Sequence, residues 1–246
     1  MNGGAIVASA GDGRPRHEQI AADIRAQIMA GEFPPGTQLP SIPTLVARYQ
    51  AATATVQRAL GALKAEGSVY SETGRGVYVR DRQPLVVEAA AYITPTQGGY
   101  EYRLIDVAEV VPPGEVAQAL DSGEDLAVMR HRLLLRGNEP VELSWSYYPA
   151  TIARGTELAR RRKIAGGAAR VLADNGHRQR DLHDRISARM PTTEEVEALA
   201  LPPYVPVIRQ FRVIRDESGR PVEVSILIKG SHLHELQHRQ DIPPES

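Results

Sequence analysis

The sequence of 246 residues contains no cysteine, few aromatic residues and almost no net charge. Without cysteine the chain can form no disulfide, thiol nucleophile or thiolate zinc site, and it suits a reducing compartment. No segment approaches the roughly 18 consecutive apolar residues of a membrane span, and residues 1–10 lack the basic start of a signal peptide. We therefore expect a cytoplasmic protein with no membrane partner.

A net charge of −1 gives no overall sign of nucleic-acid binding, so the distribution of charge matters more. Residues 1–80 contain eight Lys or Arg and six Asp or Glu, a net charge of +2, which leaves −3 for residues 81–246. This weak asymmetry has the sign expected if one domain contacts DNA and the other does not. The length also favours two domains, because domains of about 100–150 residues are the commonest.

Three helices are predicted near the N-terminus. The first spans 16–31, where isoleucines recur every fourth residue and form one apolar face. The second begins after Ser41, whose hydroxyl can cap it, and ends near residue 49. The third spans 53–66 and is closed by Gly67. Two helices joined by a tight turn thus follow a longer one.

A β-hairpin is predicted after these helices. Strands at 69–71 and 77–79 flank a glycine-rich tip with one arginine, Arg75. Three helices and a hairpin are the elements of a winged helix-turn-helix. They could also form a small domain with a purely structural role, because this periodicity is a loose signal.

The residues themselves distinguish these alternatives. The segment from Glu18 to Val79 resembles the GntR family of bacterial regulators along its whole length. The resemblance rests on Pro-Gly at 35–36, Leu-Pro-Ser at 39–41, Thr55-Val56, Ala59-Leu60, Glu66-Gly67 and Gly-Arg-Gly at 74–76. It implies a DNA-binding winged helix-turn-helix over residues 14–80, preceded by a flexible tail at 1–13.

In such folds the third helix enters the major groove and the wing tip approaches the minor groove. Gln57 has the amide geometry for bidentate pairing to adenine, whereas Arg58 and Arg75 suit phosphates or a narrow minor groove. The family commonly has arginine where this chain has Pro43, Thr53 and Gln57, so base readout does not transfer from relatives. The candidate DNA contacts are Ser41, Thr53, Thr55, Gln57, Arg58, Thr73, Gly74, Arg75 and Gly76.

An α+β domain with an antiparallel sheet is predicted for the C-terminal part. Residues 81–100 are expected to form a linker with room for one strand, and residues 241–246 a tail. Thr192 and Glu195 have the spacing of a capping box. Strands are expected at 102–110, 126–135, 141–148, 181–189, 207–214 and 222–228, and helices at 115–120, 168–175 and 193–200.

Two of the expected hairpins look alike. Residues 129–144 and 208–225 both run from an arginine through a strand and a glycine turn to Pro-Val-Glu-aliphatic-Ser, which suggests an internal duplication. With ARMPTTEEVEALAL at 188–201 and GRPVEV at 219–224, they make residues 101–240 resemble the UTRA domain of the HutC subfamily. The resemblance implies a fold like chorismate lyase and a pocket for a small-molecule effector.

Strand alternation predicts an effector face on the first hairpin. A three-residue loop at 137–139 would place the apolar residues of both strands on the core face and the polar ones opposite, whereas a two-residue loop would mix them. We expect the three-residue loop. The resemblance also implies that Arg130, Arg132 and Glu223 lie near the effector. The predicted effector contacts are Arg130, Arg132, Glu142, Ser144, Ser146, Tyr148 and Glu223.

These side chains suit a small anionic or polyhydroxylated ligand, although they could instead form a solvated strand face. Arg189 is either a ligand contact or a strand terminus. The histidines at 232, 234 and 238 are expected to be exposed tail residues rather than metal ligands, and no cofactor is expected. Because one DNA-binding domain has a net charge of only +2, we also expect a homodimer that binds an inverted repeat of operator DNA.

The expected function is sequence-specific transcription regulation, by default repression, modulated by the effector. Two alternatives remain: a regulator whose C-terminal domain only dimerises, and an enzyme like chorismate lyase. The sequence contains no recognisable nucleophile, metal cluster or phosphate loop, so no catalytic residue is predicted.

Overall fold

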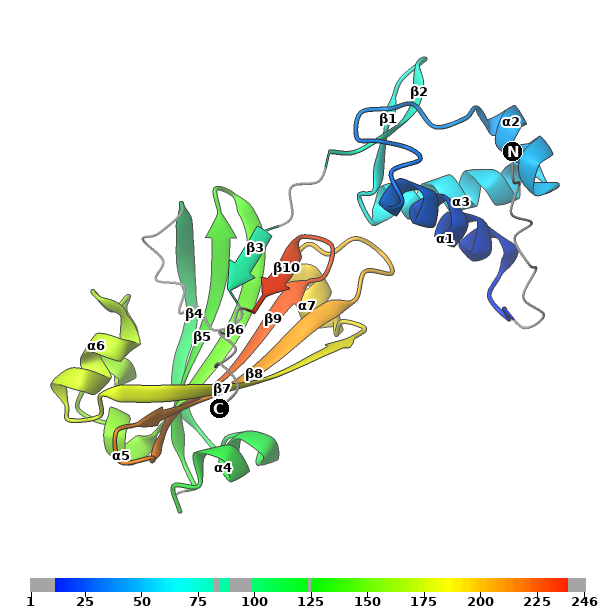
Figure 1. The fold of residues 1–246 in the computed structure, drawn as a ribbon. Coiled ribbons are helices and arrows are strands. Elements are labelled where there is room, and N and C mark those ends of the chain that lie inside the picture. Colours follow the sequence, from blue (N-terminus) through cyan, green and yellow to red (C-terminus); the bar gives the residue numbers. More distant parts are fainter. Residues whose placement is uncertain (1–11, 82–84, 89–98, 124, 239–246) are drawn as a thin grey trace, which may run out of the picture. The chain divides into compact units, whose positions relative to one another are not determined.

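The computed structural model describes residues 12–81, 85–88, 99–123 and 125–238. The chain divides near residue 83 into two compact units, which are described separately (Figure 1). Residues 1–11 of the expected tail at 1–13, the expected tail at 241–246 and most of the expected linker at 81–100 lie outside the described residues.

The N-terminal unit contains the five expected elements. Ser41 caps the second helix by accepting a hydrogen bond from the Thr44 backbone N–H at 3.3 Å. Ile20 and Ile24 of the first helix pack on Val56 of the third in one buried cluster. The elements are α1 (Arg16–Met29), α2 (Ile42–Tyr49), α3 (Thr53–Ala65), β1 (Val69–Glu72) and β2 (Gly76–Val79).

The wing is wider than the predicted hairpin. Residues 37–39 lie beside β2, where the Leu39 N–H donates to the Val77 carbonyl at 2.8 Å and the Val79 N–H donates to the Thr37 carbonyl at 2.9 Å. Gly76 has a φ of 129°, and a Cβ there would collide with the Gln38 side chain. Glycine is therefore required where the wing turns back.

The C-terminal unit is built on a six-stranded antiparallel sheet in the order β4-β5-β6-β9-β8-β7. Its strands are β4 (Tyr100–Val110), β5 (Ala127–Arg136), β6 (Glu139–Pro149), β7 (Gln179–Arg189), β8 (Val207–Asp216) and β9 (Pro221–Gly230). Its helices are α4 (Gly114–Leu120), α5 (Ala150–Ala153), the 3-10 helix η1 (Glu157–Ala159), α6 (Gly167–Asp174) and α7 (Thr193–Ala198).

The sheet has two matching halves. Each half consists of a strand, a short helix and a hairpin: β4-α4-β5-β6 and β7-α7-β8-β9. The two similar hairpins meet at the centre, where β6 pairs with β9. This arrangement fits the internal duplication inferred from their sequences. The elements α5, η1 and β10 (His234–Gln237) were not predicted.

Both faces of the sheet are covered (Figure 1). On one face α4 packs over Phe211 and Val224, and α7 packs over Leu143 and Ile228. On the other face α5, η1 and α6 cover one end, around Tyr148, and a small two-stranded sheet covers the opposite end. The polar face of the predicted hairpin thus lies within the domain.

The small sheet joins the linker to the C-terminal part of the chain. Strand β3 (Leu85–Glu88) pairs in parallel with β10, and the Leu85 N–H donates to the Leu233 carbonyl at 2.7 Å. The linker therefore does contribute a strand, and this strand belongs to the C-terminal unit. The expectation of an exposed His234 is wrong, because the side chain is buried and its Nδ1 lies 3.1 Å from the Gly230 carbonyl.

The expected three-residue loop between β5 and β6 is wrong. Arg136 pairs with Glu139, so the turn contains only two residues, and Val141 forms a β-bulge one residue pair further on. Beyond the bulge, Leu133 faces Leu143 and Arg132 faces Ser144, which is the register that the longer loop would have produced. The bulge supplies the one-residue shift that the turn does not.

Candidate DNA-binding surface and candidate effector site

The candidate base contacts lie at the start of α3. Thr53, Gln57 and Arg58 are exposed and Thr55 is half-buried, while Val56 points into the core. This follows from the helical period, because the buried residues occupy one face and leave these side chains on the other. The first two turns of α3 thus present an amide, a guanidinium and hydroxyls to solvent.

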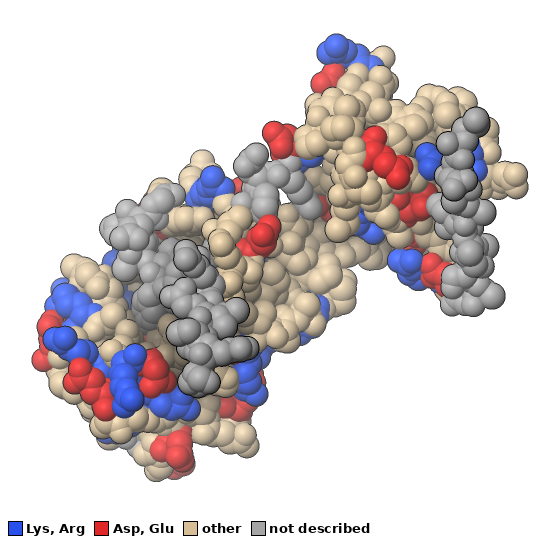
Figure 2. Space-filling view, viewed as in Figure 1, with Lys and Arg blue, Asp and Glu red and all other residues tan. Residues whose placement is uncertain are grey.

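The wing tip presents one cation. Arg75 is exposed and pairs with Glu72 at 2.9 Å, and its carbonyl accepts a hydrogen bond from Gln38 Nε2 at 2.7 Å. Figure 2 shows Lys or Arg at the tip of this hairpin. Thr73 and Gly74 are also exposed. Gln38, which holds the tip in place, was not singled out in the sequence.

Ser41 has a local role. Besides capping α2, its hydroxyl lies 2.8 Å from the Thr44 hydroxyl, so its hydrogen bonds orient the start of the helix. The side chain is nevertheless exposed, and a hydroxyl can accept and donate at once. Its role as a DNA contact remains a prediction.

The seven predicted effector residues share one face of the central sheet. Pairing of β5 with β6 and of β6 with β9 places them there. Six are buried and Arg132 is half-buried, so the alternative of a solvated strand face is wrong. A buried polar band of this kind requires internal partners or a ligand.

A hydrogen-bonded chain crosses three strands within this band. The Arg132 guanidinium donates to the Ser146 hydroxyl, which lies 2.7 Å from the Ser225 hydroxyl. Ser225 in turn donates to Glu223 Oε1 at 2.8 Å. The duplicated motif could have identified Ser225, because it occupies the place of Ser144 in the second Pro-Val-Glu-aliphatic-Ser.

Arg130 serves the fold directly. Its guanidinium donates to the carbonyls of Leu158, Arg160 and Arg162 at 2.8, 2.9 and 2.7 Å, and thereby anchors the segment after η1. Burial lowers the pKa of Arg130. Burial likewise raises the pKa of Tyr148, so its hydroxyl keeps its proton at neutral pH.

Four further polar residues, which the sequence did not reveal, complete the band. Arg212 makes two hydrogen bonds of 2.8 Å with Asp184, and both side chains are largely buried. Lys229 pairs with Glu142 at 2.8 Å and donates to Gln210 at 3.0 Å. The carboxylate of Glu142 thus already has a buried cation beside it.

Arg189, at the end of β7, has an internal partner. Arg189 donates to both carboxylate oxygens of Glu195 at 2.7 and 2.6 Å. Glu195 also accepts from the Thr192 backbone N–H at 2.8 Å and completes the expected capping box of α7. Arg189 is therefore part of a strand-to-helix junction.

Neither metal-binding clusters nor membrane spans are found where the structure is described. Among residues 12–81, 85–88, 99–123 and 125–238, no group of three or more His, Asp or Glu side chains is arranged to hold a metal ion. No helix formed by those residues is long and apolar enough to cross a membrane.

The two units define a two-domain transcription regulator: a winged helix-turn-helix followed by a domain with a buried polar band. Residues 16–79 match the model for bacterial regulatory proteins of the gntR family, and residues 96–231 match the model for the UTRA domain. The chain belongs to the GntR family and carries a UTRA domain.

Curated relatives and solved structures agree with this assignment. An uncharacterized HTH-type transcriptional regulator of Streptomyces coelicolor is 32% identical over 235 residues, covering 86% of this chain and 87% of the relative. The HTH-type transcriptional regulator GgaR of Escherichia coli is 25% identical over 223 residues, covering 88% of each chain. The chain is therefore a DNA-binding transcription regulator.

Two solved structures show the same fold. One, provisionally described as a GntR-family transcriptional regulator, has a TM-score of 0.65 at 22% identity and covers 94% of this chain and 99% of its own. PhnF from Mycobacterium smegmatis has a TM-score of 0.55 at 18% identity and covers 91% of this chain and 100% of its own.

Proposed function

We propose that this regulator is a homodimeric repressor of the HutC subfamily, which binds an inverted repeat in the cytoplasm and is controlled by a small-molecule effector. The observation that supports an effector is the buried series of hydrogen bonds from Arg132 through Ser146 and Ser225 to Glu223. Burial of a guanidinium and a carboxylate costs desolvation free energy, and a ligand that binds them would give a functional reason for that cost.

The polar band also suggests the chemistry of the effector. A guanidinium, hydroxyls and a carboxylate on one face suit a small molecule with an anionic group and hydroxyl or amino groups. Within the proposed site, Arg132 binds the anionic group and Glu223 orients a donor. Arg130 acts as a positioning residue, because its donors hold carbonyls of the segment 158–162.

The low charge of the DNA-binding unit supports dimerisation. A net charge of +2 over residues 1–80 supports few phosphate contacts, whereas two linked heads double these contacts and raise the effective concentration of the second head. For a two-fold dimer the natural operator is an inverted repeat. Enzymatic activity is not part of the proposal.

The experiment that tests this function is genome-wide mapping of DNA bound by the full chain, followed by operator titration. We expect a two-fold symmetric site bound by a dimer. Small molecules handled by the products of neighbouring genes are then added, and one of them should change operator affinity. Tight operator binding by a monomer, or an effector response that survives Arg132→Ala in a folded protein, would contradict the proposal.

A further inference from the structure

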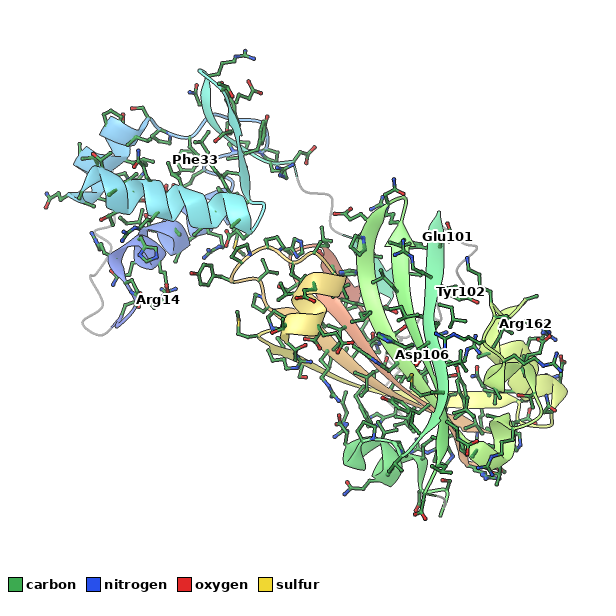
Figure 3. The ribbon with its side chains drawn as sticks, turned by 180° about the vertical axis from the view of Figure 1, so that it is seen from behind. Arg14, Phe33, Glu101, Tyr102, Asp106 and Arg162 are labelled. Carbon is green, nitrogen blue, oxygen red and sulfur yellow. The ribbon has the colours of Figure 1, made fainter. Side chains whose placement is uncertain are left out.

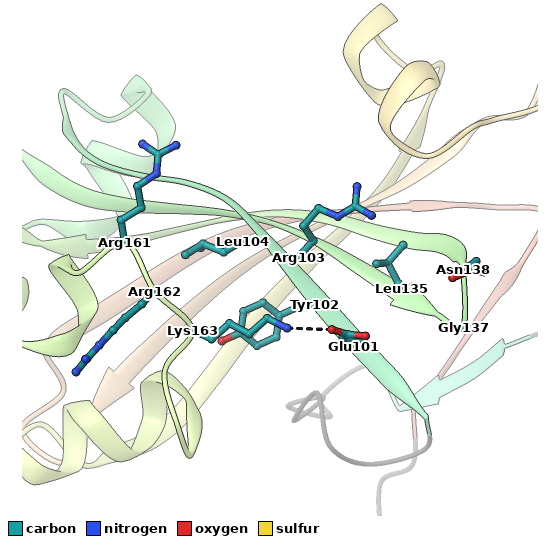
Figure 4. A pocket seen from close by; sticks show the side chains of 10 residues that line it. All are labelled: Glu101, Tyr102, Arg103, Leu104, Leu135, Gly137, Asn138, Arg161, Arg162 and Lys163. Carbon is teal, nitrogen blue, oxygen red and sulfur yellow. Dashed lines mark hydrogen bonds and ion pairs between the residues drawn. The ribbon is translucent and has the colours of Figure 1, made fainter.

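A cavity lies at the outer edge of β4, the first strand of the six-stranded sheet (Figure 4). Its volume is about 560 Å³, which suits a small organic ligand. It is lined by residues 101–104 of β4, by Leu135 of β5, by Gly137 and Asn138 of the β5–β6 turn, and by residues 161–163. None of the seven predicted effector residues lines it.

One wall of the cavity is held in place from inside the domain. The segment 158–162 is anchored by the buried Arg130 guanidinium, which binds three of its carbonyls. The Ile164 N–H donates to the Tyr102 hydroxyl at 3.1 Å, and Arg161 donates to the Ile105 carbonyl at 3.4 Å. A wall fixed in this way needs little ordering when a ligand binds.

Four cationic side chains line the cavity, Arg103, Arg161, Arg162 and Lys163, and Arg162 pairs with Glu157 at 3.2 Å. In Figure 4 the guanidinium groups of Arg103 and Arg161 extend to the same side, and Lys163 reaches across Tyr102 toward Glu101. Among the residues that the structure describes, Arg103 has no carboxylate within ion-pair distance. Figure 3 shows Glu101, Tyr102 and Asp106 along β4, beside the segment that carries Arg162.

Carboxylates already lie beside two more of these cations. Lys163 pairs with Glu101 at 3.0 Å, and Arg161 pairs with Asp106 at 2.9 Å. Both cationic side chains are more than half exposed, and such surface pairs contribute little to stability because water competes with them. A ligand with several negative charges can therefore replace the carboxylates as the partner of these cations at little cost in free energy.

We propose that this cavity binds a small polyanion, a molecule with at least two phosphate or carboxylate charges. Arg103 and Arg161 bind its anionic groups through their planar forks, and Lys163 contributes a third positive charge. This site uses different side chains from the proposed effector site, so the chain has room for two ligands.

Isothermal titration of the full chain at low ionic strength tests this proposal. Pyrophosphate and citrate serve as probes, one for phosphate and one for carboxylate polyanions. We expect saturable binding of at least one probe, about tenfold weaker or more in Arg103→Ala and in Lys163→Ala, and tighter in Glu101→Gln. Arg154→Ala, which removes an exposed cation that pairs with Glu109 on the same strand outside the cavity, is the matched control and should bind as wild type.

The same titration of Arg132→Ala separates the two sites. Unchanged probe binding supports the edge cavity, whatever the fate of the proposed effector site. Binding that is lost in Arg132→Ala and kept in Arg103→Ala would place the anion on the polar band and overturn the proposal. It is equally overturned if neither probe saturates wild type, or if Arg154→Ala weakens binding as much as Arg103→Ala does.

Discussion

Arg132 on β5 and Arg212 on β8 occupy equivalent positions in the two halves of the sheet. Arg132 lies opposite Ser144, and Arg212 lies opposite Ser225, the serine of the second copy of the motif. On the outer neighbouring strand, Asp184 faces Arg212, whereas the residue that faces Arg132 is Leu104. The duplicated hairpins thus hold one arginine in an internal ion pair and place the other beside an apolar neighbour.

Arg132→Ala should weaken the effector response. Loss of a charge-assisted hydrogen bond costs about 1.5–3 kcal/mol, which raises the effector concentration needed for half-maximal response by about 10- to 150-fold. Operator affinity without effector should stay nearly unchanged. Arg132→Lys should recover only part of the effector response, because the point charge of an ammonium group does not reproduce the two-pronged hydrogen bonding of a guanidinium. Operator titrations with and without the effector identified for wild type measure this.

Arg212→Ala should instead reduce stability. It leaves the carboxylate of Asp184 largely buried without its cation, which typically costs about 3–5 kcal/mol. The double variant Arg212→Leu with Asp184→Leu removes both charges and should regain much of that loss. Urea unfolding of the three proteins measures the difference, and equal stability of wild type and Arg212→Ala would show that the ion pair is not essential.

Gln57→Ala should relax sequence preference. If Gln57 pairs with a base edge, its loss costs about 1–3 kcal/mol on the specific operator and little on random DNA. Binding to operators with single substitutions in each half-site should then show one position at which discrimination has disappeared. An equal loss on specific and random DNA would mean that Gln57 contacts only the backbone.

Arg75→Ala should weaken binding to all sequences alike. A cation at the wing tip neutralises a phosphate or enters the minor groove, so its removal should lower the slope of log affinity against log salt by about one per head. Arg154→Ala, in the C-terminal unit, serves as the control. A salt slope unchanged from wild type would remove Arg75 from the DNA contacts.

The C-terminal unit should lose stability on acidification. Burial lowers the pKa of His131 and of His234 below the ordinary 6.5, so the folded state favours the neutral rings. Their contribution is complete above about pH 6.5 and declines as the pH falls toward the lowered values, because the unfolded chain then binds the protons more strongly. The melting temperature should fall between pH 7 and pH 5.

The double variant His131→Phe with His234→Gln should show a smaller fall over that pH range. Phenylalanine keeps the stacking that His131 makes with Trp145, at 4.5 Å between ring centroids. The exposed His183 provides the control, and His183→Gln should follow wild type. A double variant with the same acid sensitivity as wild type would assign the effect to other groups.

Local pattern was enough to predict the helices of the winged helix-turn-helix, the cap at Ser41 and most strands of the sheet. Capping and hydrophobic periodicity depend on residues close in sequence, so they can be recognised without a structure. Alternation also placed the polar residues of β5 and β6 on one face. The predicted length of the β5–β6 turn was wrong, but the predicted strand register was right. A bulge at Val141 makes up for the missing turn residue within the same hairpin.

By itself, the sequence determined the two-domain order, the elements of the DNA-binding unit and the sharing of one face by Arg132, Ser144 and Glu142. Only the tertiary structure decided which partners these side chains meet. Arg130 binds carbonyls about 30 residues away, and Asp184 neutralises Arg212 from the neighbouring strand β7. Such contacts depend on how strands and loops pack across the sheet, and a polar residue in an alternating strand shows its face in the sequence but not its partner.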